Sequence, residues 1–126
     1  MKSTIILLVM SAAIFAACSS KPKDPQETPQ ALAETIFDAA RSGNYQGLAL
    51  LVDINADGDS KMIAQAETDE TIQEEFQKYF AKGKVSADPI IEGEKASVNI
   101  LFGPDGTKEE TLEMIRKDGK WYLSSF

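Results

Sequence analysis

Apolar residues recur every three or four positions between Leu32 and Ala40, and this period predicts an amphipathic helix. Thr28 suits the cap at its start, and Pro29 suits its first position, where the missing N–H costs nothing. Gly43 predicts its end, because glycine readily adopts the left-handed conformation that follows many helices. The residues on the apolar face are Leu32, Ala33, Ile36, Phe37 and Ala40.

Further helices are expected after Gly43. Tyr45 to Val52 is a short apolar helix that can pack on the first, and Ser60 to Glu67 is another short helix. Asp69 to Lys82 is longer, has acidic residues in its first turn, where they suit the helix dipole, and ends before Gly83. Its apolar face is formed by Ile72, Phe76, Tyr79 and Phe80.

From Lys84 onward the apolar period changes to two residues, which predicts β-strands. Pro89 makes the first strand an edge or irregular one. Gly103 to Gly106 is a turn, and Asp118-Gly119 is a two-residue hairpin signal. The expected strands are Val85 to Glu92, Lys95 to Phe102, Thr107 to Lys117 and Lys120 to Phe126. Helices followed by an antiparallel meander predict an α+β domain over residues 28–126, with the helices covering one face of the sheet.

The first 17 residues have the parts of a secretory signal peptide. A short positive segment with Lys2 precedes the apolar run Ile5 to Phe15, and the small residues Ala16 and Ala17 follow. The run is too short to span a bilayer, which takes about 20 apolar residues. We therefore expect residues 1–17 to be removed on export.

Cys18 is the single cysteine of the chain. The stretch Ile14 to Cys18 resembles the lipobox of bacterial lipoproteins, although Phe15 stands where leucine is usual. The resemblance implies cleavage between Ala17 and Cys18, a diacylglyceryl group on the thiol, and membrane attachment without a transmembrane helix. Ser19, by resemblance to bacterial sorting signals, implies the outer membrane of the cell envelope. A free thiol in an uncleaved signal peptide and a core cysteine are the alternatives.

The segment that follows Cys18 is polar. Ser19 to Glu27 holds two prolines and no aliphatic residue, so residues 18–27 are expected to form an extended tether between the lipid and the domain. The whole chain carries a net charge of −7, which disfavours nucleic acid as a direct partner.

Asp53 to Asp59 matches the first half of a calcium-binding loop, with oxygen ligands at alternate positions and glycine at the sixth. The second half does not match, because Lys61 and Ala64 stand where a ligand and the bidentate glutamate belong. We therefore expect a solvated turn in which Asp57 or Asp59 caps the next helix, and no metal site.

The chain has no histidine, which excludes nucleophilic triads and metal sites that depend on this residue. With Cys18 lipidated, no cysteine nucleophile remains. We assign no catalytic residue and no cofactor. Two aromatic residues are candidates for a ligand pocket: Tyr79, whose hydroxyl lies on an apolar helix face, and Trp121. The alternatives are a core tyrosine whose hydroxyl reaches the rim and a tryptophan that anchors the last strand.

Three segments carry a resemblance to a known superfamily. They are Ser42 to Tyr45, Ile91 to Val98, and Asp118 to Leu123. Together with the order of elements they resemble small bacterial lipoproteins of the nuclear transport factor 2-like superfamily, and within it a domain family of uncharacterised function. The resemblance implies a cone in which a curved sheet wraps over helices around a hydrophobic pocket. Members include isomerases, dehydratases, hydrolases and binding modules, so the fold does not select an activity.

From these observations we expect a lipid-anchored envelope protein whose domain binds a small apolar ligand or an envelope protein without catalysing a reaction. A small-molecule isomerase, dehydratase or hydrolase of the same fold is the first alternative. A structural accessory of an envelope complex is the second.

Overall fold

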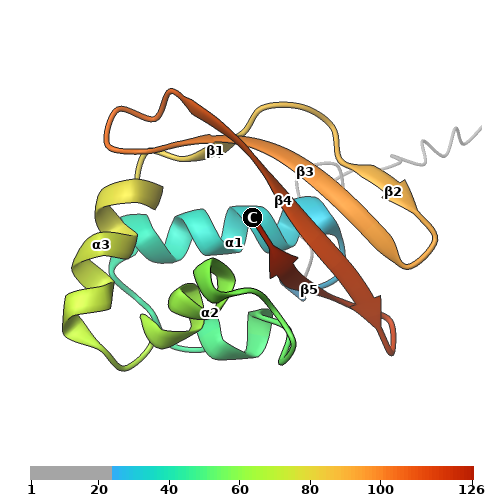
Figure 1. Cartoon of the computed structure of the whole chain (residues 1–126), viewed down its shortest axis with the longest axis horizontal. Coiled ribbons are helices and arrows are strands. Elements are labelled where there is room, and N and C mark those ends of the chain that lie inside the picture. Colours follow the sequence, from blue (N-terminus) through green and yellow to red (C-terminus); the bar gives the residue numbers. More distant parts are fainter. Residues whose placement is uncertain (1–23) are drawn as a thin grey trace, which may run out of the picture.

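The computed structural model describes residues 24–126 (Figure 1). The helical segments come first: α1 (Pro29–Ser42), the short 3-10 helix η2 (Leu48–Leu51), α2 (Gly58–Gln65) and α3 (Glu70–Phe80). The strands follow: β1 (Lys84–Val85), β2 (Ile90–Glu92), β3 (Lys95–Phe102), β4 (Lys108–Lys117) and β5 (Lys120–Ser125). This order confirms the predicted α+β class. In the described part of the chain, no helix is long and apolar enough to cross a membrane.

The first helix begins and ends as predicted. The side chain of Thr28 accepts a hydrogen bond from the N–H of Ala31 at 3.0 Å, and Gly43 follows the helix with a φ of 78°. The second helix differs from its prediction, because it is a 3-10 helix that covers only Leu48–Leu51. Helix η2 begins only after Gly47, whose φ of 88° is not helical. It ends before Val52, because Val52 forms a β-bridge to Leu123.

Aspartate caps begin the next two helices. The carboxylate of Asp57 accepts from the N–H of Ser60 at 2.9 Å, as one of the two predicted caps, and Asp69 accepts from Thr71 at 2.9 Å. Helix α3 stops at Phe80, two residues before the predicted Lys82.

Gly83 is needed for close packing as well as for the turn after α3. A Cβ atom placed on this glycine would lie 2.3 Å from a carbon of the Phe37 ring, so a larger residue would push the chain away from α1.

The strands form one antiparallel sheet in the order β1-β3-β4-β5, with β2 also paired to β3. The predicted strand Val85 to Glu92 is two short strands, because the chain leaves the ladder on either side of Pro89. Strand β3 covers the predicted residues and buries Ala96, Val98, Ile100 and Phe102. The hairpin between β4 and β5 turns at Asp118 and Gly119, which have φ angles of 51° and 79°.

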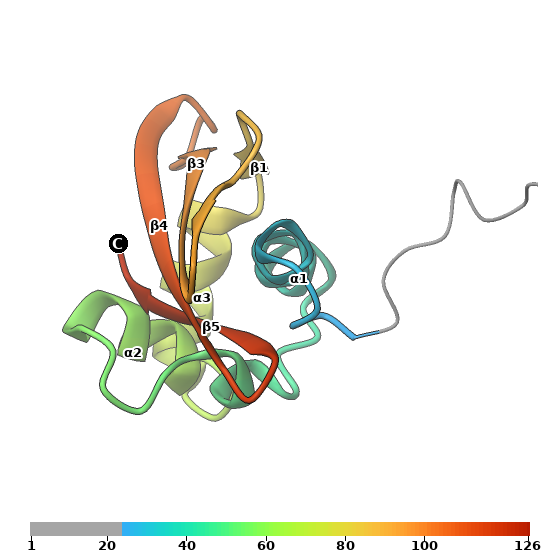
Figure 2. The ribbon, with the colours of Figure 1, turned by 90° about the vertical axis from the view of Figure 1, so that its right-hand side faces the viewer.

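One hydrophobic core lies between the helices and the inner face of the sheet. Figure 2 shows α1 nearly end-on, with the twisted strands on one side of it. The arrangement agrees with the helices-on-one-face architecture expected from the sequence. The largest fully buried apolar side chains are Phe37, Leu32, Ile36, Leu48, Ile63, Ile100, Leu112, Met114, Leu123 and Val98. Every core residue lies after Asp24, so a chain that starts at Ser19 contains the whole described fold.

The folded part begins earlier than the predicted boundary at Thr28. Gln26 is buried, its side-chain amide donates to the carbonyls of Trp121 and Leu50, and its own carbonyl accepts the N–H of Trp121. The prediction of a tether over 18–27 is therefore wrong for this residue. The polar side chain of Gln26 can be buried because the carbonyl of Trp121 in strand β5 accepts its hydrogen bond. The sequence does not reveal this partner. The signal peptide, the cleavage between Ala17 and Cys18, and the lipidation of Cys18 lie outside the described residues.

Candidate functional site: the Tyr79 pocket

Phenylalanine rings pack together where α3 lies beside the end of β3 and the residue that follows β5. Phe80 is the centre of this cluster, with ring centroids 5.2 Å from Phe76, 5.3 Å from Phe102 and 5.7 Å from Phe126. Helical spacing brings Phe76 and Phe80 to one face of α3, Phe102 ends β3, and Phe126 follows β5. Helix and sheet therefore share one aromatic wall.

A cavity of about 300 Å³ opens beside this wall, and we call it the Tyr79 pocket. Tyr79 is half-buried and lies at its edge, one residue before Phe80. The lining is mainly apolar and aromatic, with charged side chains among it: Asp59, Met62, Ile63, Glu75, Phe76, Tyr79, Phe80, Phe102, Lys108, Glu110 and Phe126. A mainly apolar cavity with a few polar groups is typical of small-molecule sites.

Two of the charged residues come from the inner row of β4. Alternate residues of a strand face the same side, and the row that buries Leu112 and Met114 continues through Glu110 to Lys108. Glu110 is paired in register with buried Ile100, and Lys108 with buried Phe102. The inner row is therefore apolar in the core and charged where it reaches the pocket.

Lys108 makes a specific contact in the pocket. Its ammonium nitrogen lies 5.4 Å from the centroid of the Phe102 ring, within the range of a cation–π interaction. An ammonium group thus already lies over one ring of the aromatic wall.

The other candidate pocket residue, Trp121, lies elsewhere. It is 2% exposed, contacts Gln26 through two backbone hydrogen-bonding groups, and is absent from the lining of the Tyr79 pocket. The guanidinium of Arg116 lies 5.2 Å from its ring centroid. The structure therefore does not bring Tyr79 and Trp121 together, and it places Trp121 as a buried residue of the last strand.

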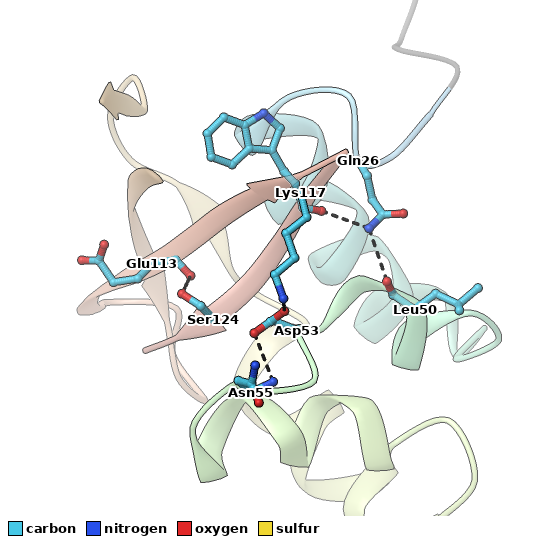
Figure 3. A network of polar contacts seen from close by, with 8 residues as sticks. Gln26, Leu50, Asp53, Asn55, Glu113, Lys117 and Ser124 are labelled. Carbon is cyan, nitrogen blue, oxygen red and sulfur yellow. Dashed lines mark hydrogen bonds and ion pairs between the residues drawn. The ribbon is translucent and has the colours of Figure 1, made fainter. Parts of the chain in front are cut away.

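The polar loop after η2 uses its carboxylates for internal contacts, and Figure 3 shows those of Asp53. Asp53 forms an ion pair with Lys117 and accepts the N–H of Asn55 at 3.1 Å. Burial raises the pKa of Asp53, but the hydrogen bonds and the charge of Lys117 outweigh it and hold the pKa below its usual value. Asp57 accepts from Ser60 and from the N–H of Phe126. In residues 24–126, no group of three metal-ligating side chains lies together.

A second hollow, of about 490 Å³, lies between α1 and the chain around β1. Five of its eleven lining residues are charged, and its arginine, Arg41, donates to Asp38 at 2.7 Å and to the carbonyl of Gly83 at 3.0 Å. This hollow offers a ligand less apolar surface than the Tyr79 pocket does. The Tyr79 pocket is therefore the better candidate site.

Sequence reasoning missed Glu110 and Lys108 as pocket residues. Only Tyr79 and Trp121 were predicted for a pocket, yet Glu110 lines the same cavity as Tyr79. The signal was present in the strand period, because Leu112 and Met114 mark the inner row and Glu110 and Lys108 continue it. Which end of that row would lie beside α3 required the three-dimensional structure.

Comparison with known proteins adds one structural similarity. No protein-family model and no curated protein matches the chain. Among solved structures, the chain is similar to one from Campylobacter jejuni described as a "Putative NTF2-like transpeptidase". The two share 20% sequence identity and a TM-score of 0.49, over 79% of this chain and 98% of the other. A similarity of this size carries no argument about ligand, activity or partner.

Proposed function

We propose that this chain is a lipid-anchored protein of the bacterial envelope whose domain binds a small ligand in the Tyr79 pocket. The observation that carries the binding function is the cavity itself, which has an aromatic wall and a charged rim in a domain of about 100 residues. The anchoring function rests on the sequence that precedes and includes Cys18. The two parts of the proposal are tested separately.

The position of the chain's start agrees with both parts. Figure 1 shows α3, which lines the pocket, on one side of the molecule, and the chain entering α1 on the opposite side. Five residues lie between Cys18 and Asp24. The six residue-to-residue steps from Cys18 to Asp24 span at most about 20 Å when fully extended. A lipid on Cys18 would hold the end with Gln26 toward the membrane and leave the Tyr79 pocket at the other end.

Native mass spectrometry tests the binding function. A soluble form, in which a cleavable secretory signal without a lipidation site replaces residues 1–18, is purified gently from the envelope of its host, and its intact mass is compared before and after denaturation. We expect an additional mass of a small molecule that leaves on unfolding. A clean protein mass, or a complex with another protein, would instead favour the structural accessory.

Metabolic labelling with an alkyne-tagged fatty acid tests the anchor. We expect the full chain to incorporate the label and to fractionate with membranes, and the Cys18→Ala variant to do neither. A labelled Cys18→Ala variant would place the acyl group elsewhere and overturn this part of the proposal.

An enzyme of the same fold is the second candidate, and one observation favours it. Tyr79 and the carboxylate of Glu110 line the same cavity, and a tyrosine with an acid is a pair of groups that can move protons. A panel of ester, lactone and ketosteroid substrates tests this candidate. Turnover by the wild type that both Tyr79→Phe and Glu110→Gln abolish would establish catalysis in place of simple binding.

A further inference from the structure

We infer that the Tyr79 pocket selects an organic cation, an amine carried on a small ring or a short apolar chain. The inference rests on the proposed ligand-binding function and adds the chemical class of the ligand. It is argued from the aromatic wall, the charge of the rim and the size of the cavity.

The aromatic wall suits a positive charge. The face of an aromatic ring is the negative end of its quadrupole, so a cation within about 6 Å of the centroid is attracted. Lys108 provides a direct example, with its ammonium nitrogen 5.4 Å from the centroid of Phe102. The pocket therefore holds an amine of the protein itself over one of its rings, and a ligand amine would compete with this ammonium for the same ring.

The rim also favours a cation. Three carboxylates, on Asp59, Glu75 and Glu110, line the cavity, together with the ammonium of Lys108. A second ammonium, that of Lys78, lies 5.6 Å from the centroid of the Tyr79 ring, so the acids still outnumber the cations. Within residues 24–126, none of these three acids forms an ion pair, and Glu110 accepts only the N–H of the next residue, at 3.2 Å. The surplus of negative charge attracts a cationic ligand and repels an anionic one. A fatty acid is therefore a poor candidate, although the wall alone would accept its chain.

The size of the cavity limits the apolar part of the ligand. About 300 Å³ is at the small end of the volumes that ligand sites occupy. One ring or a short chain fits such a volume, whereas a two-chain lipid does not. Phenethylamine has the required features, and its alcohol and carboxylate counterparts have nearly the same shape.

The test compares phenethylamine, phenethyl alcohol and phenylpropionate by calorimetric titration into the chain that starts at Ser19. We expect the amine to bind about tenfold more tightly than the alcohol, a difference of about 1.4 kcal/mol, and the carboxylate to bind most weakly. Equal affinity of amine and alcohol would overturn the inference and leave the binding function intact. Binding of none of the three would also overturn the inference, and the native mass spectrum would then decide separately whether the pocket binds another small molecule.

Two matched pairs of variants assign the selectivity to the pocket. Lys108→Ala removes the competing ammonium, and we expect it to raise the affinity for phenethylamine severalfold. Lys120→Ala makes the same change in net charge in the distant β4–β5 hairpin and should have no such effect. Equal effects of the two variants would mean that only net charge matters, and would overturn the inference.

Glu110→Gln is expected to lower the affinity for phenethylamine severalfold and to leave that for phenethyl alcohol unchanged. Its control is Glu109→Gln, the exposed neighbour that belongs to the opposite row of β4. Circular dichroism on all four variants confirms that each is folded before titration. Unchanged amine affinity in folded Glu110→Gln would exclude the rim carboxylate as a source of selectivity.

Discussion

Positively charged side chains lie over aromatic rings in two different regions of the domain, and the polar groups around them are used differently in the two regions. Arg116 lies 5.2 Å from the centroid of Trp121, and Lys108 lies 5.4 Å from that of Phe102. The first pair belongs to what we call the Trp121 cluster, formed by Gln26, Gly93, Glu94, Arg116 and Trp121. The second pair belongs to the Tyr79 pocket.

In the Trp121 cluster, the polar groups already form hydrogen bonds within the protein. Arg116 donates to Glu94 at 2.8 Å and to the carbonyl of Gly93 at 3.4 Å, while Trp121 is 2% exposed and paired with Gln26. In the Tyr79 pocket, Lys108 and the rim acids form no ion pair within residues 24–126, and a cavity remains beside them. The same aromatic contact therefore stabilises the fold in one place and leaves groups available to a ligand in the other.

The largest effect is expected from Trp121→Ala. The variant removes a buried aromatic side chain and should lower the free energy of unfolding by about 3–5 kcal/mol. Tyr122→Ala is the matched control, because Tyr122 is the half-buried neighbour on the other face of β5 and should cost much less. Chemical denaturation followed by circular dichroism measures both. If the two variants lost the same stability, Trp121 would not be a specific anchor of the last strand.

Gln26→Ala is expected to have the next largest effect. It leaves the carbonyls of Trp121 and Leu50 without their side-chain donor, at a cost of about 1–3 kcal/mol in unfolding free energy. Gln30→Ala is the control, because its amide bonds only to Glu34 on the exposed side of α1. Denaturant midpoints of the two variants make the comparison. Equal midpoints would mean that the residues before α1 do not contribute to the fold.

Much of the fold was predictable because its signals are local. Thr28, Asp57 and Gly43 act on the backbone within a few residues, and the hairpin at Asp118-Gly119 needs only its own two residues. The alternation of apolar and polar residues in β3 correctly predicted which face of the strand is buried. Boundaries were predicted less well where the deciding partner lies far away in the sequence, as with Val52, whose bridge to Leu123 shortens η2.

The candidate site was only half predictable. Tyr79 was found because its hydroxyl lies on an apolar helix face, but Trp121, which looked equally suitable, lies in a different part of the domain. Gln26 was predicted to belong to the tether, because no local pattern reveals that the backbone of β5 forms hydrogen bonds with it. Glu110 and Lys108 become pocket residues only because α3 packs beside one end of the sheet. The period of a strand predicts which residues share a face, but not which distant element packs against that face.

A smaller effect is expected from Asp53→Asn, and it depends on pH. Because the pKa of Asp53 in the folded protein is below its ordinary value of 3.8, the carboxylate contributes stability above the unfolded pKa. That contribution is lost as the pH falls through the folded pKa. We expect Asp53→Asn to cost about 1 kcal/mol near neutral pH, through the lost contact with Lys117, and to cost progressively less below about pH 4.

Thermal unfolding of wild type and Asp53→Asn between neutral pH and pH 2 measures this difference. Asp88→Asn serves as the control, because Asp88 is exposed in the chain between β1 and β2. A difference between wild type and Asp53→Asn that stays constant over the whole range would contradict the assignment of the charge as the stabilising feature.

The smallest effect is expected from Glu94→Gln, which tests how much of the Trp121 cluster depends on its ion pair. The hydrogen bond from Arg116 lowers the pKa of Glu94, and the pair therefore favours the folded state above the unfolded pKa and loses this contribution in acid. Both partners are exposed, however, with 39% and 66% of their side chains accessible, so water and salt screen the attraction.

We expect Glu94→Gln to shift the melting temperature only slightly, and we expect the shift to disappear in high salt, because the glutamine can still accept a hydrogen bond from Arg116. Glu92→Gln, which changes an exposed acid of β2 outside the cluster, is the control. A large loss that persists in high salt would mean that the ion pair holds Arg116 over Trp121. The ion pair, and not only the burial of Trp121, would then stabilise the Trp121 cluster.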